Sequence, residues 1–349
     1  MKKFITCLLI VSMVLSIVAC GGNGSDTTNQ NKSSGQTEQS GGEVVVKFAH
    51  DYTTNSPYHK AAEFFKKTLE EKTNGEMKVE IYPAQQLGSA REMIEGMQMG
   101  NIELVWTPTA KFAGFDQKLT LLDLPYLFPN EDIMWEALEG EIGEMLVEGL
   151  EKIGIKGLTF NAEGYKHFTA NKAIESPEDL KGMKIRTMEA PVIMDMFKAW
   201  GANPVPIDFA EVYNSLQQNV VDGEENPIIS IHDMKFYEVQ KNISLSDHAY
   251  LTYFLSASSK WFDGLSEAHQ KAVIDTSLEM QKYHRKINDE AVEGYLKNME
   301  EYGIVINEIT PENREKFKEL TKPLYDQYRN EIGGELIDAA LEFGESRVK

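Results

Sequence analysis

Hydrophobic residues follow two alternating periods along residues 43–106. Segments in which every second residue is apolar are typical of strands, whereas apolar residues three or four positions apart are typical of helices. The first helix has a serine N-cap followed by proline, which favours a helix start. Strands separated by helices predict a parallel sheet with right-handed crossovers. The predicted elements are strands at 43–49, 77–81 and 102–106, and helices from Ser56-Pro57 to Asn74-Gly75 and over about 89–99.

The alternation of strands and helices begins again after residue 150. Ser176-Pro177-Glu178-Asp179 has the order of a capping box, in which two side chains satisfy backbone amides at a helix start. Two α/β halves of similar size predict two domains with a cleft between them, and small-molecule sites favour such interfaces. The predicted elements are strands at 155–161 and 183–187, and helices starting at Ser176, after Pro191 (to about Trp200) and at Asp208.

The stretch from Ser266 to about Tyr302 is a candidate for one long helix. It contains no proline and one glycine, and its apolar residues keep helical spacing. A continuous helix would be about 55 Å long at 1.5 Å per residue, enough to brace both halves. The alternative is two helices that break near Glu293-Gly294, and the sequence leaves both open.

The N-terminal region has a different composition. Lys2-Lys3 precedes a short apolar run, which is the layout of a secretory signal peptide. The run ends at Ile17-Val18-Ala19-Cys20, which resembles the lipobox of bacterial lipoproteins. That resemblance implies cleavage before Cys20 and lipid attached to it; the alternative is an ordinary signal peptide with an incidental cysteine. Residues 21–43 are nearly all Gly, Ser, Asn, Thr and Gln, a composition typical of a flexible tether.

Charge and cysteine content exclude several classes of function. The chain has a net charge of −20, with 42% hydrophobic and 26% charged residues, and this balance is typical of a globular protein. An acidic surface repels nucleic acid, so we expect no nucleic-acid partner. The two cysteines, Cys7 and Cys20, both lie in the predicted signal region. The folded body therefore has no cysteine for a disulfide, a metal site or a thiol nucleophile.

Sequence motifs for covalent or metal chemistry are missing. The chain contains no P-loop, HExxH, GxSxG or EF-hand sequence, so we expect neither an enzyme nor a bound cofactor or metal. The acidic cluster Asp222-Gly223-Glu224-Glu225 superficially suggests calcium. It lacks the alternating ligand spacing, and we predict a solvated turn there.

Arg186 is the candidate for ligand recognition that the residues themselves suggest. It ends a short predicted strand just before a helix, and an arginine fork matches a carboxylate with two parallel hydrogen bonds. The alternative is a structural salt bridge with one of the many nearby acids, since structural ion pairs are commoner than ligand contacts.

Several segments resemble the DctP-type solute-binding proteins of TRAP transporters. The resemblance covers about residues 45–325, and the order and spacing of the segments make it specific. The segments are Tyr82-Pro-Ala-Gln-Gln-Leu-Gly88 with Arg91-Glu92, Leu124-Pro125-Tyr126, Gly182-Met-Lys-Ile-Arg186, Gly201-Ala-Asn-Pro-Val-Pro206, Phe209-Ala-Glu-Val-Tyr213, Leu216-Gln-Gln, Val221-Asp-Gly-Glu-Glu-Asn-Pro227 and Phe236-Tyr237-Glu238-Val239.

The resemblance implies an α/β, two-domain, periplasmic-binding-protein-like fold. Crossing strands join the domains at a hinge, a long helix spans them, and both close around a ligand in a central cleft. The expected segments are a signal peptide at 1–19, the lipidated cysteine and tether at 20–43, domain I at 44–163 plus about 252–291, and domain II at about 164–251 plus 292–349.

The resemblance also implies roles for individual residues. Arg186 is expected to form a salt bridge with the ligand carboxylate, and Asn226 to hydrogen-bond the ligand, the alternative for Asn226 being a helix cap before Pro227. Phe209 matches an aromatic wall of the site, although such a ring also suits the core. Tyr213, one helical turn further on, is a second lining candidate.

One position departs from the family pattern. Many members have a second arginine where this chain has Lys166; lysine keeps the charge but loses the planar fork. A second carboxylate or a sugar hydroxyl is a possible partner there, so the ligand's identity stays open. His50, Trp106 and Thr109 lie at strand ends of the first domain, where family members place further contacts.

The function expected from this resemblance is extracytoplasmic solute binding. The ligand is a small organic acid, either a sugar acid such as a uronate or a C4-dicarboxylate, and the protein delivers it to TRAP membrane permease subunits. We expect a monomer held to the outer face of the cell membrane by lipid on Cys20. The alternatives are a sensor subunit that presents the ligand to a receptor, the binding protein of an ATP-driven importer, and an enzyme on the same scaffold.

Overall fold

The structure is a computed structural model that describes residues 44–348. The predicted signal peptide at 1–19, and Cys20 with its tether at 20–43, lie outside the described residues. The chain divides into two units, Met1–Gly41 and Gly42–Lys349, and all the described residues belong to the second. None of the helices within 44–348 is both long and apolar enough to cross a membrane.

The first of two sheets within the described residues has five strands in the order β2-β1-β3-β10-β4. β1 pairs in parallel with β2 and β3, as predicted, with helices as crossovers. β10 and β4 extend the sheet in antiparallel pairs, so the sheet as a whole is mixed. The strands are β1 Val44–His50, β2 Met77–Tyr82, β3 Leu104–Pro108, β4 Ile155–Tyr165 and β10 Tyr250–Ser258.

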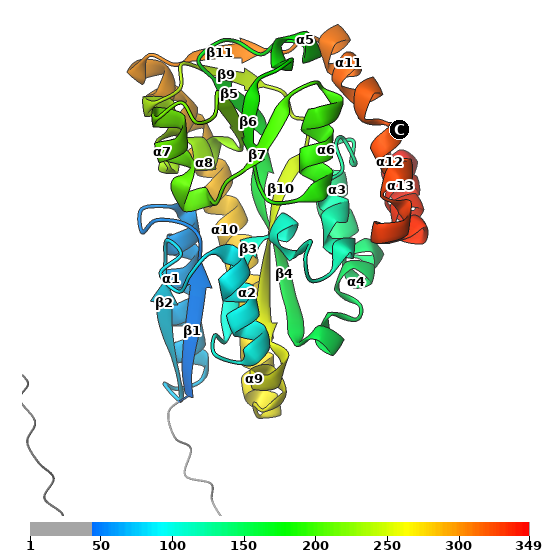
Figure 1. Ribbon diagram of the computed structural model, residues 1–349. Coiled ribbons are helices and arrows are strands. Elements are labelled where there is room, and N and C mark those ends of the chain that lie inside the picture. Colours follow the sequence, from blue (N-terminus) through cyan, green and yellow to red (C-terminus); the bar gives the residue numbers. More distant parts are fainter. Residues whose placement is uncertain (1–43, 349) are drawn as a thin grey trace, which may run out of the picture. The chain divides into compact units, whose positions relative to one another are not determined.

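The second sheet has six strands in the order β11-β9-β5-β8-β6-β7. Lys166 alone separates β4 from β5, and residues 246–249 separate β9 from β10, so two short links carry the chain between the sheets at neighbouring points (Figure 1). The longer segment between β10 and β11 is a third connection. We call the two halves the first lobe and the second lobe after their sheets. The strands are β5 His167–Ala170, β6 Lys184–Thr187, β7 Asn203–Pro206, β8 Gly223–Asn226, β9 Asn242–Leu245 and β11 Val305–Glu308.

The predicted helix starts are present where the cap residues indicated them. Ser56 accepts a hydrogen bond from the amide of His59 at the start of α1, and Ser176 and Asp179 form a capping box at α5. The α-helices are α1 Pro57–Lys72, α2 Ala90–Met99, α3 Glu131–Leu138, α4 Glu141–Val147, α5 Pro177–Leu180, α6 Pro191–Ala199, α7 Val212–Gln217, α8 Ile228–Asp233, α9 Ser259–Asp263, α10 Glu267–Tyr302, α11 Pro311–Thr321, α12 Pro323–Gln327 and α13 Gly334–Arg347.

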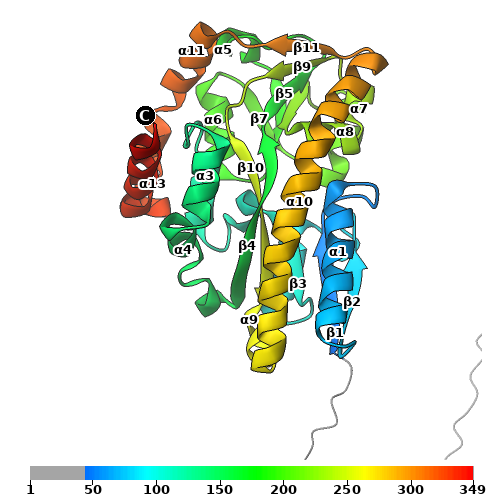
Figure 2. The same cartoon turned by 180° about the vertical axis from the view of Figure 1, so that it is seen from behind.

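Helix α10 is continuous over 36 residues and therefore decides between the two sequence alternatives. It packs against α1 of the first lobe, the crossing strand β4 and α8 of the second lobe, and Figure 2 shows it running past both sheets. It ends at Gly303, whose φ of +111° suits glycine better than any other residue. The long helix is the brace between the lobes that its length predicted.

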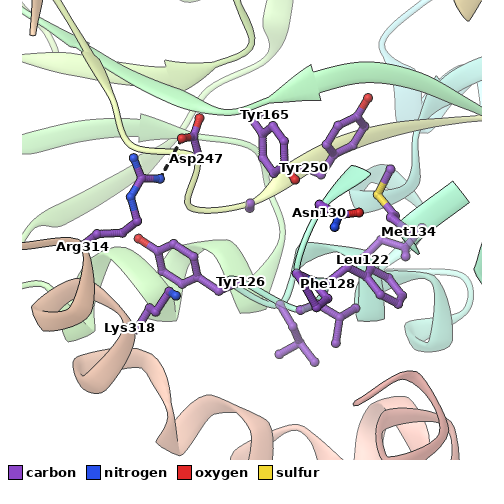
Figure 3. A pocket seen from close by; sticks show the side chains of 14 residues that line it. Leu122, Tyr126, Phe128, Asn130, Met134, Tyr165, Asp247, Tyr250, Arg314 and Lys318 are labelled. Carbon is purple, nitrogen blue, oxygen red and sulfur yellow. Dashed lines mark hydrogen bonds and ion pairs between the residues drawn. The ribbon is translucent and has the colours of Figure 1, made fainter. Parts of the chain in front are cut away.

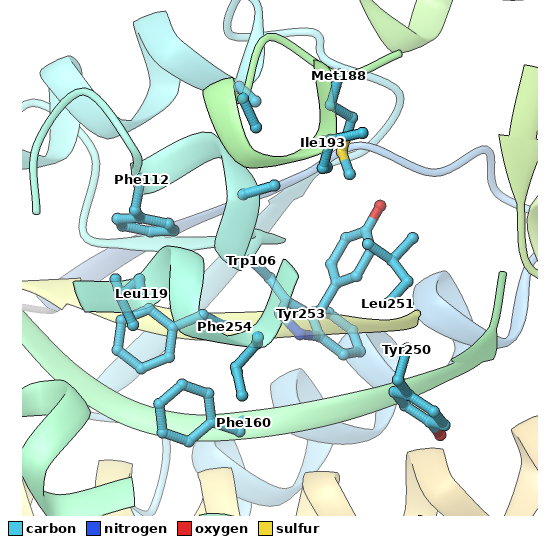
Figure 4. Packing of buried hydrophobic residues seen from close by; sticks show 14 of the residues in the cluster. Trp106, Phe112, Leu119, Phe160, Met188, Ile193, Tyr250, Leu251, Tyr253 and Phe254 are labelled. Carbon is cyan, nitrogen blue, oxygen red and sulfur yellow. The ribbon is translucent and has the colours of Figure 1, made fainter. Parts of the chain in front are cut away.

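Aromatic side chains form the core beside the crossing strand β10 (Figure 4). The rings of Tyr58 and Trp106 are 4.6 Å apart between centroids, and those of Tyr58 and Tyr253 are 4.5 Å apart. Further along β10, Phe254 stacks on Phe160 of β4 at 4.9 Å. This packing fixes β10 in place, and with it the residues that β10 presents to the space between the lobes.

The prediction of a solvated turn at Asp222–Glu225 was wrong. Gly223–Asn226 is the buried strand β8, in which Glu224 is 0% and Glu225 is 1% exposed. A Cβ on Gly223 would lie 2.3 Å from the carbonyl oxygen of Thr169, so glycine permits β8 to approach β5 closely. Glu224 accepts a hydrogen bond from Thr169 of β5, and Glu225 pairs with Lys166, which links β4 to β5. These partners are remote in sequence, so the compensation leaves no signal in the local sequence.

The predicted helix start at Asp208 was only partly right. A short 3₁₀ turn, Phe209–Glu211, precedes α7, and the Asp208 side chain caps neither. Instead, Asp208 forms an ion pair with Lys111 of the first lobe. A tertiary partner has therefore replaced the local capping bond.

Candidate functional site

A small cavity, of about 10 Å³, lies where strand ends of both sheets meet. The first lobe contributes residues that follow β1 and β3, and the second lobe contributes residues at the ends of the parallel strands β6 and β8. Open α/β sheets bind ligands at the carboxyl ends of their parallel strands. The lining residues are Asp51, Gln85, Pro108, Lys111, Arg186, Met188, Phe209, Asn226, Leu251 and Tyr253.

Arg186 is the most informative side chain in this cavity. It is 1% exposed, and its Nε donates a hydrogen bond to the carbonyl oxygen of Ile207 at 2.9 Å. Its Nη2 is buried without a hydrogen-bond partner among the described residues. Burial lowers the pKa of Arg186, and the nearby Glu224 and Glu225 oppose that effect. A buried guanidinium with an unused N–H fits an incoming anion.

The salt bridge proposed as the alternative role of Arg186 is not found. Within 44–348, no carboxylate lies within 4.0 Å of its guanidinium nitrogens, the distance that defines an ion pair. Glu224, which is near in space, accepts hydrogen bonds from Thr169 and Asn226 instead. Arg186 therefore keeps its charge available to the cavity.

Lys111 is a second cation at the cavity, and it has a partner. Its Nζ is 3.4 Å from Oδ1 of Asp208, so this ion pair joins the first lobe to the second. Burial and the neighbouring charge of Arg186 lower the pKa of Lys111, while Asp208 and Asp51 act in the opposite direction.

Asp51 and Gln85 form a hydrogen-bonded pair on the first-lobe side. Gln85 Nε2 donates to Asp51 Oδ1 at 3.0 Å, and Thr107 Oγ1 donates to Asp51 Oδ2 at 2.6 Å. Gln85 has a φ of +58°, a left-handed conformation that is uncommon outside glycine. The backbone amide of Gln85 donates to the carbonyl oxygen of His50. This bond attaches the turn to the end of β1 and directs the Gln85 side chain toward Asp51.

Three of the predicted site residues meet at this cavity, namely Arg186, Phe209 and Asn226. The Asn226 side chain donates to Glu224, and helix α8 has Pro227 as its N-cap with no side-chain capping bond. The alternative role of Asn226 as a helix cap is therefore not found. The Phe209 ring lies edge-on to the ring of Tyr52 at 5.4 Å between centroids.

The other five predicted site residues do not line the cavity. Lys166 is fully buried and pairs with Glu225, with Nζ 3.3 Å from Oε1. The Tyr213 hydroxyl donates to Glu238 at 3.1 Å. The remaining three also have partners elsewhere: His50 Nε2 is 3.1 Å from Nδ1 of His59, the Trp106 ring packs in the aromatic core, and Thr109 Oγ1 donates to the carbonyl oxygen of Thr252 at 3.3 Å.

Several lining residues were not identified from the sequence. Gln85 lies inside one of the quoted motifs, and Asp51 directly follows His50, so both had a positional signal. Lys111 and Tyr253 had none, because a 3₁₀ turn (η1, Thr109–Phe112) and the remote strand β10 bring them to the cavity.

A larger pocket, of about 250 Å³, lies elsewhere and contains none of the predicted site residues. It is lined by residues around α3, α11 and the crossing segments (Figure 3). Its arginine, Arg314, is already paired with Asp247 at 2.7 Å and donates to the backbone of Ser246. We favour the smaller cavity because its arginine has an unused buried donor.

No group of three or more histidine, cysteine, aspartate or glutamate side chains with metal-binding geometry occurs within 44–348. The polar side chains that line the cavity are the guanidinium of Arg186, the ammonium of Lys111 in its ion pair with Asp208, the Asp51 carboxylate, the amides of Gln85 and Asn226, and the Tyr253 hydroxyl. Such a set of fixed donors and acceptors can orient a small polar ligand.

Comparison with known proteins gives the family. The family model of the bacterial extracellular solute-binding proteins, family 7 (DctP), matches residues 48–331. The chain is 35% identical to the 2,3-diketo-L-gulonate-binding periplasmic protein YiaO of Escherichia coli, over 85% of this chain and 91% of that protein. It is 32% identical to the C4-dicarboxylate-binding protein DctB of Bacillus subtilis, over 98% of this chain and 99% of that protein.

Solved structures agree with the sequence relatives. The sugar acid binding protein DctPAm of Advenella mimigardefordensis, in complex with galactonate, is similar with a TM-score of 0.85, 31% identity, and coverage of 87% of this chain and 99% of that chain. A TRAP periplasmic solute-binding protein of Sulfurospirillum deleyianum with bound succinate has a TM-score of 0.82, 33% identity, and coverage of 88% and 100%. The chain therefore belongs to family 7 of the bacterial extracellular solute-binding proteins, the DctP-type binding proteins of TRAP transporters.

Proposed function

We propose that this protein binds a small organic acid in the cavity between its lobes, with Arg186 as the anchor of the ligand carboxylate. The observation that carries the proposal is the buried Nη2 of Arg186, which lacks a hydrogen-bond partner among the described residues. A carboxylate is the natural partner because it accepts two parallel hydrogen bonds from a guanidinium. An arginine left unpaired in a buried site is costly, and a bound anion removes that cost.

The remaining cavity residues have complementary roles in this proposal. Asn226 offers an amide beside Arg186, and Phe209 forms an aromatic wall. The ligand contacts that the family resemblance implies for Lys166, Tyr213, His50, Trp106 and Thr109 stay predictions, because none of these five side chains lines the cavity in this structure.

The relatives support an organic acid as the ligand class. The names of the relatives specify 2,3-diketo-L-gulonate and C4-dicarboxylates, and the similar structures hold galactonate and succinate. All of these ligands have at least one carboxylate, the group that Arg186 is suited to bind.

Transport follows from the family. We propose that the lobes, 44–163 with about 252–291 and about 164–251 with 292–349, close about the crossing strands and that the closed protein docks on TRAP permease subunits as a monomer. It performs no chemical step on its ligand. Lipid on Cys20 would keep it at the outer face of the membrane, as the lipobox-like sequence before that residue suggests.

The experiment is a thermal-shift screen of a soluble form that starts at Gly42, the first residue of the compact unit. The panel holds C4-dicarboxylates, uronates, aldonates, keto acids and sialic acid, with neutral sugars as controls. A ligand at 100 times its Kd adds about 2.7 kcal/mol to the free energy of unfolding. We expect Arg186→Ala to weaken binding by about 2–5 kcal/mol, and Arg347→Ala, a surface arginine, to leave it unchanged. Unchanged affinity in Arg186→Ala would remove Arg186 from the site.

A further inference from the structure

The two cations that line the cavity differ in whether each has a carboxylate partner. These cations are Arg186 and Lys111. Lys111 already has Asp208 at 3.4 Å as its partner, whereas Arg186 has no carboxylate within ion-pair distance in the described chain. Arg186 is therefore the cation of the cavity that has no carboxylate at ion-pair distance among the described residues, and Asp51 is the acid that lines the same cavity.

Asp51 supplies a hydrogen-bond acceptor on the first-lobe side of the cavity, across from Arg186. It is 4% exposed and lines the cavity from the first lobe, whereas Arg186 lines it from the second. Thr107 and Gln85 each use one lone pair on a different carboxylate oxygen of Asp51. An ionised carboxylate can accept about four hydrogen bonds, so Asp51 keeps capacity for hydroxyl donors of a ligand.

The protonation state of Asp51 depends on two opposing influences. Burial raises the pKa of Asp51, while the hydrogen bonds from Thr107 and Gln85 and the charge of Lys111 lower it. Asp208 is the other acid that faces Asp51, and it is held in the ion pair with Lys111. Burial is the largest of these influences, so the pKa of Asp51 lies above its usual value of 3.8. Once ionised, the Asp51 carboxylate is an acceptor and repels a second carboxylate.

Resting on the proposed function, we infer that Asp51 sets the ligand class: the cavity takes a monocarboxylate with several hydroxyl groups, a sugar acid, in preference to a dicarboxylate. The single carboxylate pairs with Arg186, and ligand hydroxyls donate to Asp51 and exchange hydrogen bonds with Gln85. At a pH at which Asp51 is ionised, a dicarboxylate would place its second charge in the same cavity as that carboxylate, where Lys111 is already paired with Asp208. Buried like charges are strongly unfavourable, so this arrangement selects against such ligands.

The sharpest test compares pairs of acids that differ at one terminal carbon. D-erythronate becomes meso-tartrate, and D-galactonate becomes galactarate, when the terminal CH₂OH is oxidised to a carboxylate. Calorimetry on the soluble form that starts at Gly42, at pH 8, gives each Kd. We expect the monocarboxylate of the better-binding pair to bind at least about tenfold more tightly than its dicarboxylate. Succinate, which has no hydroxyl group, is expected to bind more weakly than either monocarboxylate.

Asp51→Asn tests the residue itself. We expect it to weaken monocarboxylate binding by about tenfold and to reduce the preference over the matching dicarboxylate, because the repelling charge is gone. Asp263→Asn, at an exposed aspartate, is the matched control. If Asp51→Asn does not fold, the ratio of dicarboxylate Kd to monocarboxylate Kd in the unmodified protein tests the preference.

The outcomes separate this inference from the proposed function. Equal or tighter binding of the dicarboxylates, or an unchanged preference in a folded Asp51→Asn protein, would overturn the role of Asp51 while acid binding at Arg186 stands. Absence of binding by every acid in the wider panel would overturn both.

Discussion

The hydroxyl oxygens of Tyr52 and Ser230 lie 2.6 Å apart, and the two residues belong to different lobes. Tyr52 follows β1 of the first lobe, whereas Ser230 lies in α8 of the second. Both hydroxyls donate to the same carboxylate oxygen of Glu163, which is 1% exposed in the crossing strand β4. A buried polar cluster therefore joins both lobes at the strand that connects them.

We expect Tyr52→Phe to destabilise the contact between the lobes. The substitution removes one donor to Glu163 and the approach to Ser230 while keeping the ring. Leaving a buried polar group without one of its hydrogen bonds costs about 1–3 kcal/mol, which should appear in urea denaturation and as faster ligand release.

Tyr82→Phe is the matched control for this variant. Its hydroxyl donates to the exposed Glu80, so the same chemical change should have little effect there. If both variants unfold at the same urea concentration as the unmodified protein, the cluster does not hold the lobes together.

Glu163 also predicts a pH dependence of stability. Burial raises the pKa of Glu163 to about 7, while hydrogen bonds from Ser230, Tyr52 and Tyr58 oppose that rise. Because the folded pKa lies above the usual 4.5, the protonated group favours the fold. Its contribution is complete below about pH 4.5 and is lost as the pH rises through about 7.

Glu163→Gln, which stays neutral, should therefore gain stability relative to the unmodified protein as the pH rises from 5 to 8. The difference should change by up to about 1.4 kcal/mol per pH unit within the window between the two pKa values. Urea denaturation at four pH values measures it, with the exposed Glu300→Gln as control. Parallel profiles for Glu163→Gln and the unmodified protein would show that Glu163 does not titrate in this range.

The sequence predicted the elements whose signals are local. The serine caps of α1 and α5 and the helical spacing of α10 depend on residues within a few positions of one another. The parallel pairing of β1, β2 and β3 followed from the alternation of strands and helices along the chain. The continuity of α10 could not be predicted, because an exposed glycine such as Gly294 is compatible with both a helix and a break.

The site was predictable only where a motif identified it. Arg186 was a candidate from its place at a predicted strand end and from the family resemblance, whereas Asn226 and Phe209 were found through the resemblance alone. The structure brings all three to one cavity. The roles of Asp51, Lys111 and Tyr253 depend on segments remote in sequence, and β8 looked like a turn because its acids are paired through tertiary contacts. Periodicity does not report such compensation.

Lys166 and Glu225 predict a coupled effect on stability. Both side chains are 1% exposed and their charges are 3.3 Å apart. Burial opposes the charge of Glu225, but Lys166 and His248 outweigh it and hold the pKa of Glu225 below its usual range. Lys166→Met would strand the carboxylate, at a cost of about 3–5 kcal/mol in the free energy of unfolding.

The double variant Lys166→Met with Glu225→Gln should recover a large part of that loss, because it removes both buried charges. Chemical denaturation of both single variants and the double variant completes the cycle. Simple additivity of the two single effects would contradict a direct pairing. An altered ligand Kd in the folded double variant would instead give Lys166 a role in binding.

Gly294 offers a stabilising substitution in the middle of α10. It is exposed, and a Cβ added there would have no heavy atom within 4 Å. Glycine in a helix interior is less favourable than alanine by about 0.5–1 kcal/mol, because glycine loses more backbone entropy on folding. Gly294→Ala should therefore raise the free energy of unfolding by about that amount, measured by urea denaturation.

Gly303→Ala is the opposing control for this substitution. Gly303 ends the same helix with a φ of +111°, a conformation that strains any residue with a Cβ. We expect it to lower stability, while Gly294→Ala raises it. If Gly294→Ala is destabilising, the helix is bent or broken at this position in solution, and α10 then does not act as one rigid brace between the lobes.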